Sequence, residues 1–265
     1  MCNASTNMTD TNFHFSCSND GFEGALDRVC QFFISPTFSE NSSEREMNAV
    51  DSEFKMAMQV DPWHNFNLTQ MTSNPDSRFN TFMCGNLDTL KQDGIRESLL
   101  DFHKKWYSSN IMCLTVLGNH GLDTLEKWVR ERFTPIKNID VEVPNLCEPH
   151  PFPQEYLGKE ISFVPVQDKD SLTLTFILPY YELELKTQPL NYFSHLFGHE
   201  GENSLLSYLV SEGLALELMS SPGHNLWGFS DFSVDITLTK KGLQNYQKVV
   251  EAFFMYAQKL KEAGP

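Results

Sequence analysis

The sequence is poor in positive charge, with 20 lysines and arginines against 35 aspartates and glutamates and a net charge of −15. Proteins that bind nucleic acid need a basic surface for the phosphates, so this composition excludes nucleic acid as a general partner. No apolar run approaches the roughly 18 residues of a membrane span, and the polar residues 1–18 contain no signal-peptide core. We therefore expect neither nucleic acid nor a membrane among its partners.

The sequence also lacks any closely spaced cysteine pair. Its six cysteines include no CxxC motif and no tight framework of the kind that staples small secreted domains. This usage is typical of reduced thiols and predicts a cytoplasmic protein. The cysteines are Cys2, Cys17, Cys30, Cys84, Cys113 and Cys147.

What the sequence does contain is enough apolar surface for a large core, with 40% hydrophobic and 12% aromatic residues in 265. Apolar residues recur with strand-like and helix-like periods in alternation, which predicts an α+β fold of sheets layered with helices. The strands are expected at 11–17, 111–117, 161–166, 172–178 and 230–238. The helices are expected at 22–34, around 45–53, and at 95–107, 122–133, 189–209 and 243–261.

A proline-rich segment divides this pattern, with four prolines in residues 143–153. Prolines at this density favour an extended linker. We predict a first domain over residues 1–145, a linker over 146–156 and a second domain over 157–265.

Two carboxylates, Glu46 and Glu53, stand seven residues apart in a run without glycine or proline. On a helix this spacing places both on one face, two turns apart, beside an apolar stripe that includes Met47 and Val50. Ser39 precedes the run and can cap such a helix. The pattern fits either a solvated acidic face or a functional groove, and it does not decide between them.

A second pattern sets His195 and His199 four residues apart, followed by Glu200. On a helix both imidazoles would share one face at a spacing suited to a metal ion. Gly198 stands where a general base would be needed for zinc hydrolysis. The alternatives are a surface histidine pair and a metal site made of the two histidines and Glu200.

Several separated segments together resemble one family. Residues 23–33, 45–53, 106–110 and 198–201 are similar to the insulysin and nardilysin branch of the pitrilysin family of zinc metalloendopeptidases, and the similarity extends over residues 3–265. The resemblance implies two incomplete pitrilysin-type metallohydrolase domains. The first would be the C-terminal portion of the metal-bearing domain, and the second the N-terminal portion of a domain that carries an exosite.

The resemblance also implies roles for the two carboxylates. In that family, an HxxEH motif supplies two zinc ligands and a general base, and a glutamate on a downstream helix supplies the third ligand. Glu53 matches that third ligand, and Glu46 matches an acid that supports the metal site. No HxxEH occurs in this sequence, and one carboxylate cannot hold Zn²⁺ tightly. We therefore expect the chain as given to be inactive as a peptidase.

The remaining matches concern peptide binding. His195, Gly198 and Glu200 match an exosite that anchors the substrate's N-terminus. The edge strand whose backbone pairs with the peptide is matched by Leu218, Met219 and Ser220. Asn3 and Ala4 match the active-site edge strand.

Two functions follow as hypotheses. The first is zinc-dependent endopeptidase activity on peptide substrates in the complete family member. The alternative is a non-catalytic paralogue or fragment that binds peptides or partner subunits. The expected partners are peptides, together with the missing halves of the same protein or a second copy in a homo-oligomer.

Overall fold

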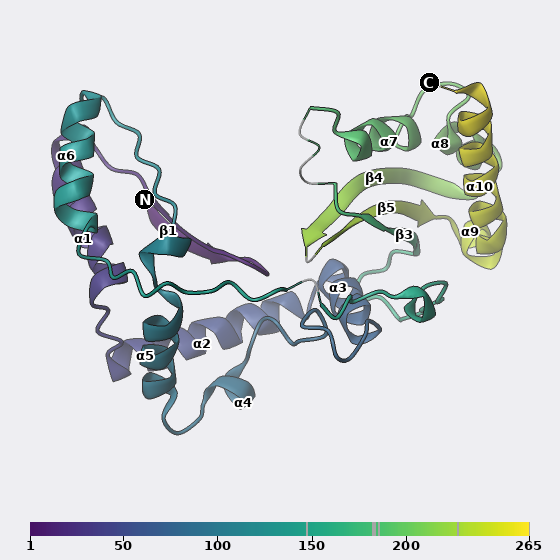
Figure 1. The fold of residues 1–265 in the computed structure, drawn as a ribbon. Helices are drawn as coiled ribbons and strands as arrows, with labels where there is room; N and C mark the ends of the chain where they lie inside the picture. Colours follow the sequence, from purple (N-terminus) through teal and green to yellow (C-terminus); the bar gives the residue numbers. More distant parts are fainter. Residues whose placement is uncertain (147, 182–183, 185, 227, 265) are drawn as a thin grey trace. The chain divides into compact units, whose positions relative to one another are not determined.

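A computed structural model of the chain describes residues 1–146, 148–181, 184, 186–226 and 228–264, so Cys147 lies outside the described residues. Two compact units form (Figure 1), one from residues 1–57 and 82–145 and the other from residues 58–81 and 146–265. The division at the proline-rich linker stays a prediction. The residues that carry the family resemblance are distributed over both units.

The first unit begins with an antiparallel hairpin of β1 (Cys2–Thr6) and β2 (Thr11–Phe15), followed by the short helix η1 (Asn19–Gly21) and by α1 (Phe22–Ile34). The alternating side chains of β2 place Phe13 toward α1, where its ring lies 5.1 Å from that of Phe33. The strand predicted at 11–17 and the helix predicted at 22–34 are confirmed.

Two further helices match their predictions, α5 (Ile95–Trp106) and α6 (Leu122–Phe133). The helices α1 and α6 pack together, and each buries a leucine, Leu26 and Leu125. An ion pair of 2.5 Å between Arg132 and Glu23 joins the same two helices.

The predicted acidic helix is α2 (Glu40–Ala57), and the Ser39 hydroxyl accepts a hydrogen bond from the Ser42 amide at its start. Its half-buried stripe contains Met47, Val50 and Phe54. The short helix α4 (Leu87–Leu90) lies next to α2 in the fold.

A buried carboxylate, Asp51, fixes α2 to α4. One oxygen accepts a hydrogen bond of 3.0 Å from the Leu87 amide, and the other lies 2.6 Å from the Lys55 ammonium. The Lys55 ammonium, followed by the Leu87 amide, holds the pKa of Asp51 below its ordinary value. The sequence analysis did not single out Asp51, because an acid in a helix carries no sign of burial.

Two predicted strands are wrong. Residues 111–117 form the end of a short helix, η2 (Ser109–Ile111), and then extended chain without a strand, and residues 161–166 are likewise extended chain (Figure 1). Leu117 is 91% exposed and Val164 is 92% exposed. A strand exists only when a neighbour accepts its backbone hydrogen bonds. No other described segment pairs with either of these, although their apolar composition favours a sheet.

The second unit is built on a three-stranded antiparallel sheet in the order β3-β5-β4 (Figure 1). The strands are β3 (Ser171–Pro179), β4 (Ala215–Leu226) and β5 (Phe229–Leu238), so the strands predicted at 172–178 and 230–238 are confirmed. One face of β5 is fully buried, with Val234 and Ile236 at 0% exposure. This face forms the core with residues of the helices α7, α8 and α10.

The helices of this unit are shorter than predicted. The helix expected at 189–209 is two helices, α7 (Pro189–Phe197) and α8 (Leu205–Ser211), and the Ser204 hydroxyl caps the second by accepting a hydrogen bond of 3.1 Å from the Ser207 amide. The helix expected at 243–261 is α9 (Lys240–Gln244) followed by α10 (Tyr246–Ala263), with a non-helical Asn245 between them. A serine cap therefore separates the first pair of helices, and a single non-helical residue separates the second.

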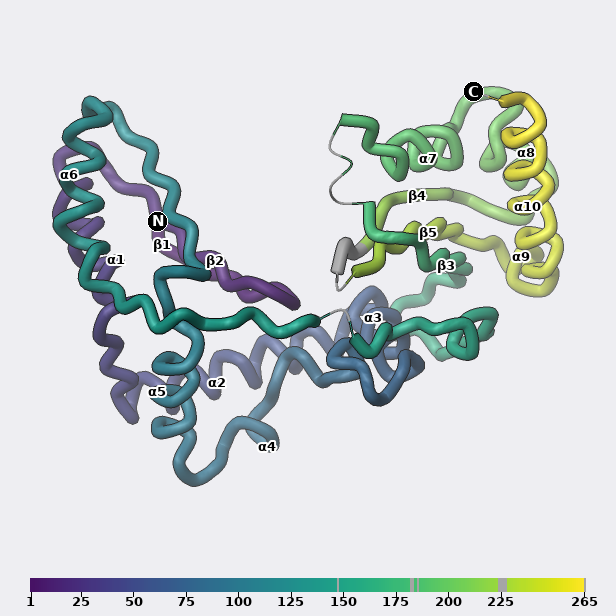
Figure 2. The backbone as a smooth tube through the Cα atoms, viewed as in Figure 1, coloured from purple at the N-terminus to yellow at the C-terminus, as the bar shows by residue number. Residues whose placement is uncertain are grey.

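Residues 58–81 join the second unit through an aromatic cluster. This segment contains α3 (Asp61–Met71), and the ring of Phe79 lies 5.4 Å from Phe152 and 6.0 Å from Phe229. The Asn74 amide also donates a hydrogen bond of 2.8 Å to the Pro151 carbonyl. Figure 2 shows these segments, far apart in sequence, side by side around α3. Near them lies the short helix η3 (Gln154–Tyr156).

No helix among the described residues is long and apolar enough to cross a membrane.

A close backbone approach fixes α9 in the second unit. A Cβ atom on Gly242 would lie 1.9 Å from the Leu214 carbonyl oxygen, and the Gly242 amide donates a hydrogen bond to the Thr239 hydroxyl. We expect Gly242→Ala to lower the free energy of unfolding by about 2–3 kcal/mol, because backbone has to move. Urea unfolding followed by circular dichroism measures this. The control is Gly121→Ala, where a Cβ meets nothing within 4 Å; an equal loss in both variants would contradict the steric explanation.

The pairing of Asp51 predicts a pH dependence of stability. The pKa of Asp51 is lower in the folded protein than in the unfolded chain. Its contribution to the free energy of unfolding is therefore fully present above the unfolded pKa of about 3.9 and is lost as the pH falls through the folded pKa. We expect Asp51→Asn to be less stable than the natural chain at pH 7 and the difference to vanish in acid. Urea midpoints at several pH values test this. The exposed Asp101→Asn is the control and should show no such trend.

Candidate functional site

The two acidic residues of α2 lie as predicted on one side of the helix. They are separated by about 10.5 Å along the axis and about 20° around it, as seven helical residues require. Both are exposed and border the half-buried stripe. No hydrogen bond or ion pair within the described residues engages Glu46 or Glu53, so both carboxylates are available to a ligand.

One thiol lies near Glu53. Burial, and secondarily the negative charge of Glu53, raise the pKa of the half-buried Cys84. Phe54, the residue after Glu53, packs its ring 5.7 Å from that of Phe82. The segment 82–84 therefore lies along the part of α2 that carries Glu53, an arrangement that the sequence analysis did not predict.

The described residues do not make up a zinc site. Among them there is no group of three histidine, cysteine, aspartate or glutamate side chains that could hold a metal ion. Stable zinc binding needs three or four such ligands. Glu53 offers one of them, and no imidazole accompanies it.

Asn3 and Ala4 lie in β1, on the outer side of the hairpin. Met1 and Ser16 exchange two backbone hydrogen bonds of 2.8 Å. Because the backbone groups of successive strand residues point to opposite sides, those of Asn3 also point toward β2, and those of Ala4 point to the free edge. The Ala4 amide already donates a hydrogen bond of 2.9 Å to the Asn3 side chain. A peptide strand that joined this edge would have to replace that contact.

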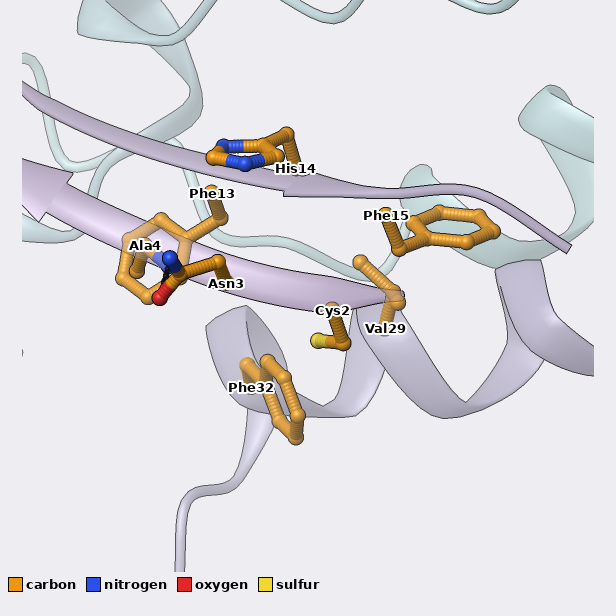
Figure 3. Close-up of a pocket in the computed structure, with 8 residues that line it drawn as sticks. All are labelled: Cys2, Asn3, Ala4, Phe13, His14, Phe15, Val29 and Phe32. Carbon is orange, nitrogen blue, oxygen red and sulfur yellow. Dashed lines mark hydrogen bonds between the residues drawn. The ribbon is translucent and has the colours of Figure 1, made fainter.

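Beneath the same strand is an apolar cavity of about 250 Å³. Figure 3 shows Val29 and Phe32 rising from α1 toward the hairpin, and Cys2 facing them, while His14 lies on the opposite side. The cavity is lined by Cys2, Asn3, Ala4, Phe13, His14, Phe15, Val29 and Phe32. An apolar side chain placed against β1 has space here.

The end of α7 and the strand β4 bring together Gly198 and Ser220, two residues predicted to share a site. A Cβ on Gly198 would lie 2.9 Å from the Ser194 carbonyl of its own helix and 3.0 Å from the Ser220 hydroxyl, so a larger residue here would have to displace these groups. Two hydrogen bonds clamp the same point, from the Ser194 hydroxyl to the Ser220 carbonyl (2.5 Å) and from the Ser220 hydroxyl to the Ser194 carbonyl (2.9 Å). The sequence analysis did not identify Ser194.

The strand β4 is an edge strand, as predicted. In its register with β5, the backbone groups of Met219 point toward β5, and those of Leu218 and Ser220 point to the free edge. Pro222 lies on the same edge and has no backbone N–H to donate. The Leu218 side chain is buried in the core at 3% exposure, whereas Met219 is 72% exposed. Leu218 can therefore meet a peptide only through its backbone.

His195 and His199 do not lie on one helix, so the prediction that both imidazoles share a helix face is wrong. The helix α7 ends at Phe197, and the rings of His195 and His199 are 6.2 Å apart with their planes 51° from parallel. Glycine at 198 ends the helix before the second histidine. Both rings and Glu200 are exposed, and within the described residues the three do not form a metal-binding group.

Comparison with known proteins identifies the family on both parts of the chain. Residues 1–76 match the family model for insulinase (peptidase family M16), and residues 94–265 match the peptidase M16 inactive domain. The chain is 39% identical to insulin-degrading enzyme of Drosophila melanogaster over 269 residues, which cover 99% of this chain and 27% of that protein. It is 35% identical to rat (Rattus norvegicus) nardilysin, covering 99% of this chain and 24% of that protein.

The fold agrees with this relationship. The crystal structure of pitrilysin superposes with a TM-score of 0.84 at 26% identity, covering all of this chain and 28% of that one. The prediction of an α+β fold of the pitrilysin type is thereby confirmed. The chain spans about a quarter of the length of the curated relatives that it matches. It belongs to peptidase family M16, in the branch of insulin-degrading enzyme and nardilysin.

Proposed function

We propose that this chain is the part of a zinc-dependent endopeptidase that contributes one metal ligand, Glu53, and two edges for peptide binding. The observation that carries the proposal is a pair of exposed carboxylates, Glu46 and Glu53, that no described residue engages, on a helix that Asp51 anchors. Glu53 would complete the shell of a Zn²⁺ whose other ligands come from polypeptide outside these residues, and Glu46 would support it. Zinc, when bound, would supply the Lewis acid that activates water.

The residues of this chain have a positioning role in this proposal. Asp51 fixes the register of α2 relative to α4, so Glu53 is presented on a helix that cannot rotate freely. An extended peptide would add to the free edge of β1 and place an apolar side chain over the cavity beside Val29 and Phe32. Affinity would come from main-chain hydrogen bonds, and selectivity from the cavity.

A chimaeric enzyme tests this proposal. Residues 1–265 would replace the matching region of Drosophila insulin-degrading enzyme, and peptide hydrolysis and bound zinc would be measured. We expect Glu53→Gln to lower activity by at least about 100-fold with loss of zinc, and Glu46→Gln to lower it about 10- to 100-fold.

Glu44→Gln is the matched control for these variants. It removes one exposed carboxylate from the opposite side of α2 and should leave activity unchanged. A chimaera that folds and retains zinc and activity after Glu53→Gln would overturn the assignment.

We further propose that the free edge of β4 and the end of α7 form the exosite. Glu200 is exposed, within the described residues it has no ion-pair partner, and a carboxylate suits the α-ammonium of a peptide. Leu218 would offer both its backbone groups, whereas Ser220 would offer only its amide, since Ser194 occupies its carbonyl. This edge therefore offers a peptide fewer free backbone groups than a fully open edge strand would, so we expect weak binding.

Fluorescence anisotropy with a labelled peptide measures exosite binding by the chain itself. We expect Glu200→Gln to weaken binding of a peptide with a free N-terminus about 2- to 5-fold, the range of an exposed ion pair. Binding of the same peptide with an acetylated N-terminus should not change. Glu202→Gln, two residues away and also exposed, is the control; equal effects of the two variants would point to general electrostatics instead.

A second candidate function is a non-catalytic protein that binds peptides or partner subunits. The absence of a three-ligand metal group within the described residues favours it. A separate possibility, a metal site made of His195, His199 and Glu200, predicts stoichiometric zinc in the purified chain, and elemental analysis that finds no zinc would eliminate it. We also propose a cytoplasmic location, since the described cysteines are free thiols.

A further inference from the structure

One turn in the second unit depends on the protonation state of a histidine. The Phe152 amide donates a hydrogen bond of 3.0 Å to Nδ1 of the His150 ring, two residues earlier in the chain. A ring nitrogen accepts a hydrogen bond only while it carries no proton, so this contact requires the neutral imidazole with its proton on Nε2. A charged imidazole has two donors and no acceptor. The contact is therefore lost when His150 takes up a proton.

The same turn attaches the segment 58–81 to the rest of the second unit. The Asn74 amide donates a hydrogen bond of 2.8 Å to the Pro151 carbonyl, and the Asn74 side chain donates one of 3.2 Å to the His150 carbonyl. The ring of Phe152 lies 5.4 Å from that of Phe79. Residues 150–152 thus hold this segment through both hydrogen bonds and aromatic packing.

Burial makes the loss of the ring contact costly. Pro151 is fully buried, Phe79 is 2% exposed and Phe152 is 8% exposed. A buried amide that loses its acceptor reduces the population of the closed turn by about 5- to 150-fold, since water cannot replace the acceptor without opening the structure. Protonation of one ring therefore acts on the whole turn.

No acid is placed to pair with a charged His150. The charged side chains on the segments around the ring are Glu148, Asp76, Arg78 and Asp231. The first three are exposed, and Asp231 of β5 lies against Gly223. None of the ion pairs among the described residues includes His150. What faces the ring from β5 is the Phe229 side chain, at 5.6 Å.

We propose that His150 is an acid-sensitive latch on the segment 58–81. At neutral pH the ring accepts the Phe152 amide and the turn is closed. As the pH falls from 7 to 5, the range in which histidines ordinarily become charged, proton uptake at Nδ1 opens the turn and loosens the contacts to Asn74 and Phe79. The chain joins this segment to the first unit at both ends, before residue 58 and after residue 81. The latch therefore sets how firmly the second unit holds a segment that the first unit supplies.

Hydrogen–deuterium exchange of the purified chain, followed by NMR, tests the latch. A protection factor compares the observed exchange rate with that of an unfolded peptide at the same pH, so the ordinary pH dependence of exchange cancels. We expect the protection factors of the Asn74 and Phe152 amides to fall at least about 5-fold between about pH 7.5 and about pH 5. The Leu214 amide, which donates to the Leu209 carbonyl, should keep its protection, because the change is local.

Two variants separate the ring proton from the shape of the turn. His150→Asn keeps an acceptor for the amide two residues on but cannot be charged, so protection should not depend on pH. His150→Phe keeps a ring without an acceptor, so protection of the Phe152 amide should be low at both pH values. His64→Asn is the control and should keep the pH trend. Nε2 of His64 contacts the Met58 carbonyl at 3.0 Å, a hydrogen bond that a charged ring also donates.

The natural chain decides the test if a variant fails to fold. Nitrogen NMR of its histidine rings near pH 7.5 should show His150 with its proton on Nε2, and a proton on Nδ1 would overturn the proposal. Protection of the Asn74 and Phe152 amides that is unchanged in acid would overturn it as well. An equal loss in acid in folded His150→Asn would do the same.

Discussion

The central strand β5 is the constraint on which the second unit depends. It hydrogen-bonds to β3 along one edge and to β4 along the other, and its even-numbered side chains are almost wholly buried. This one strand fixes the direction of every backbone group on its neighbours. The direction of the outward backbone groups of β4, to which a peptide is proposed to add, follows from this register.

Small residues determine which backbone groups of the β4 edge stay free. Gly198 lets α7 approach β4, and the paired hydroxyls of Ser194 and Ser220 then hold it there. The result is an edge with few open donors, at which only a short peptide segment would fit.

In the first unit the corresponding constraint is the buried Asp51. It satisfies a backbone donor of α4 and an ammonium of its own helix, and so sets the side of α2 that faces outward. Glu46 and Glu53 are exposed because the stripe of Met47, Val50 and Phe54 is turned inward. The candidate metal ligand is therefore oriented by residues that themselves have no part in metal chemistry.

The sequence by itself determined the α+β class, the family, and those elements whose periodicity is strong and whose ends carry local signals. The helix 122–133, the strand 230–238 and the pair Glu46 and Glu53 on one helix face are examples, because amphipathic period and capping are properties of neighbouring residues. Only the tertiary structure decided that residues 111–117 and 161–166 are not strands, since pairing depends on a distant neighbour. It also decided that Asp51 is buried, that Ser194 and Ser220 clamp one another, and that His195 and His199 lie on either side of a helix end. The burial of Asp51 and the serine clamp depend on contacts between residues far apart in the sequence, which no local pattern encodes. The position of the histidines depends on the end of α7 at Phe197, which the apolar period running on to residue 209 concealed.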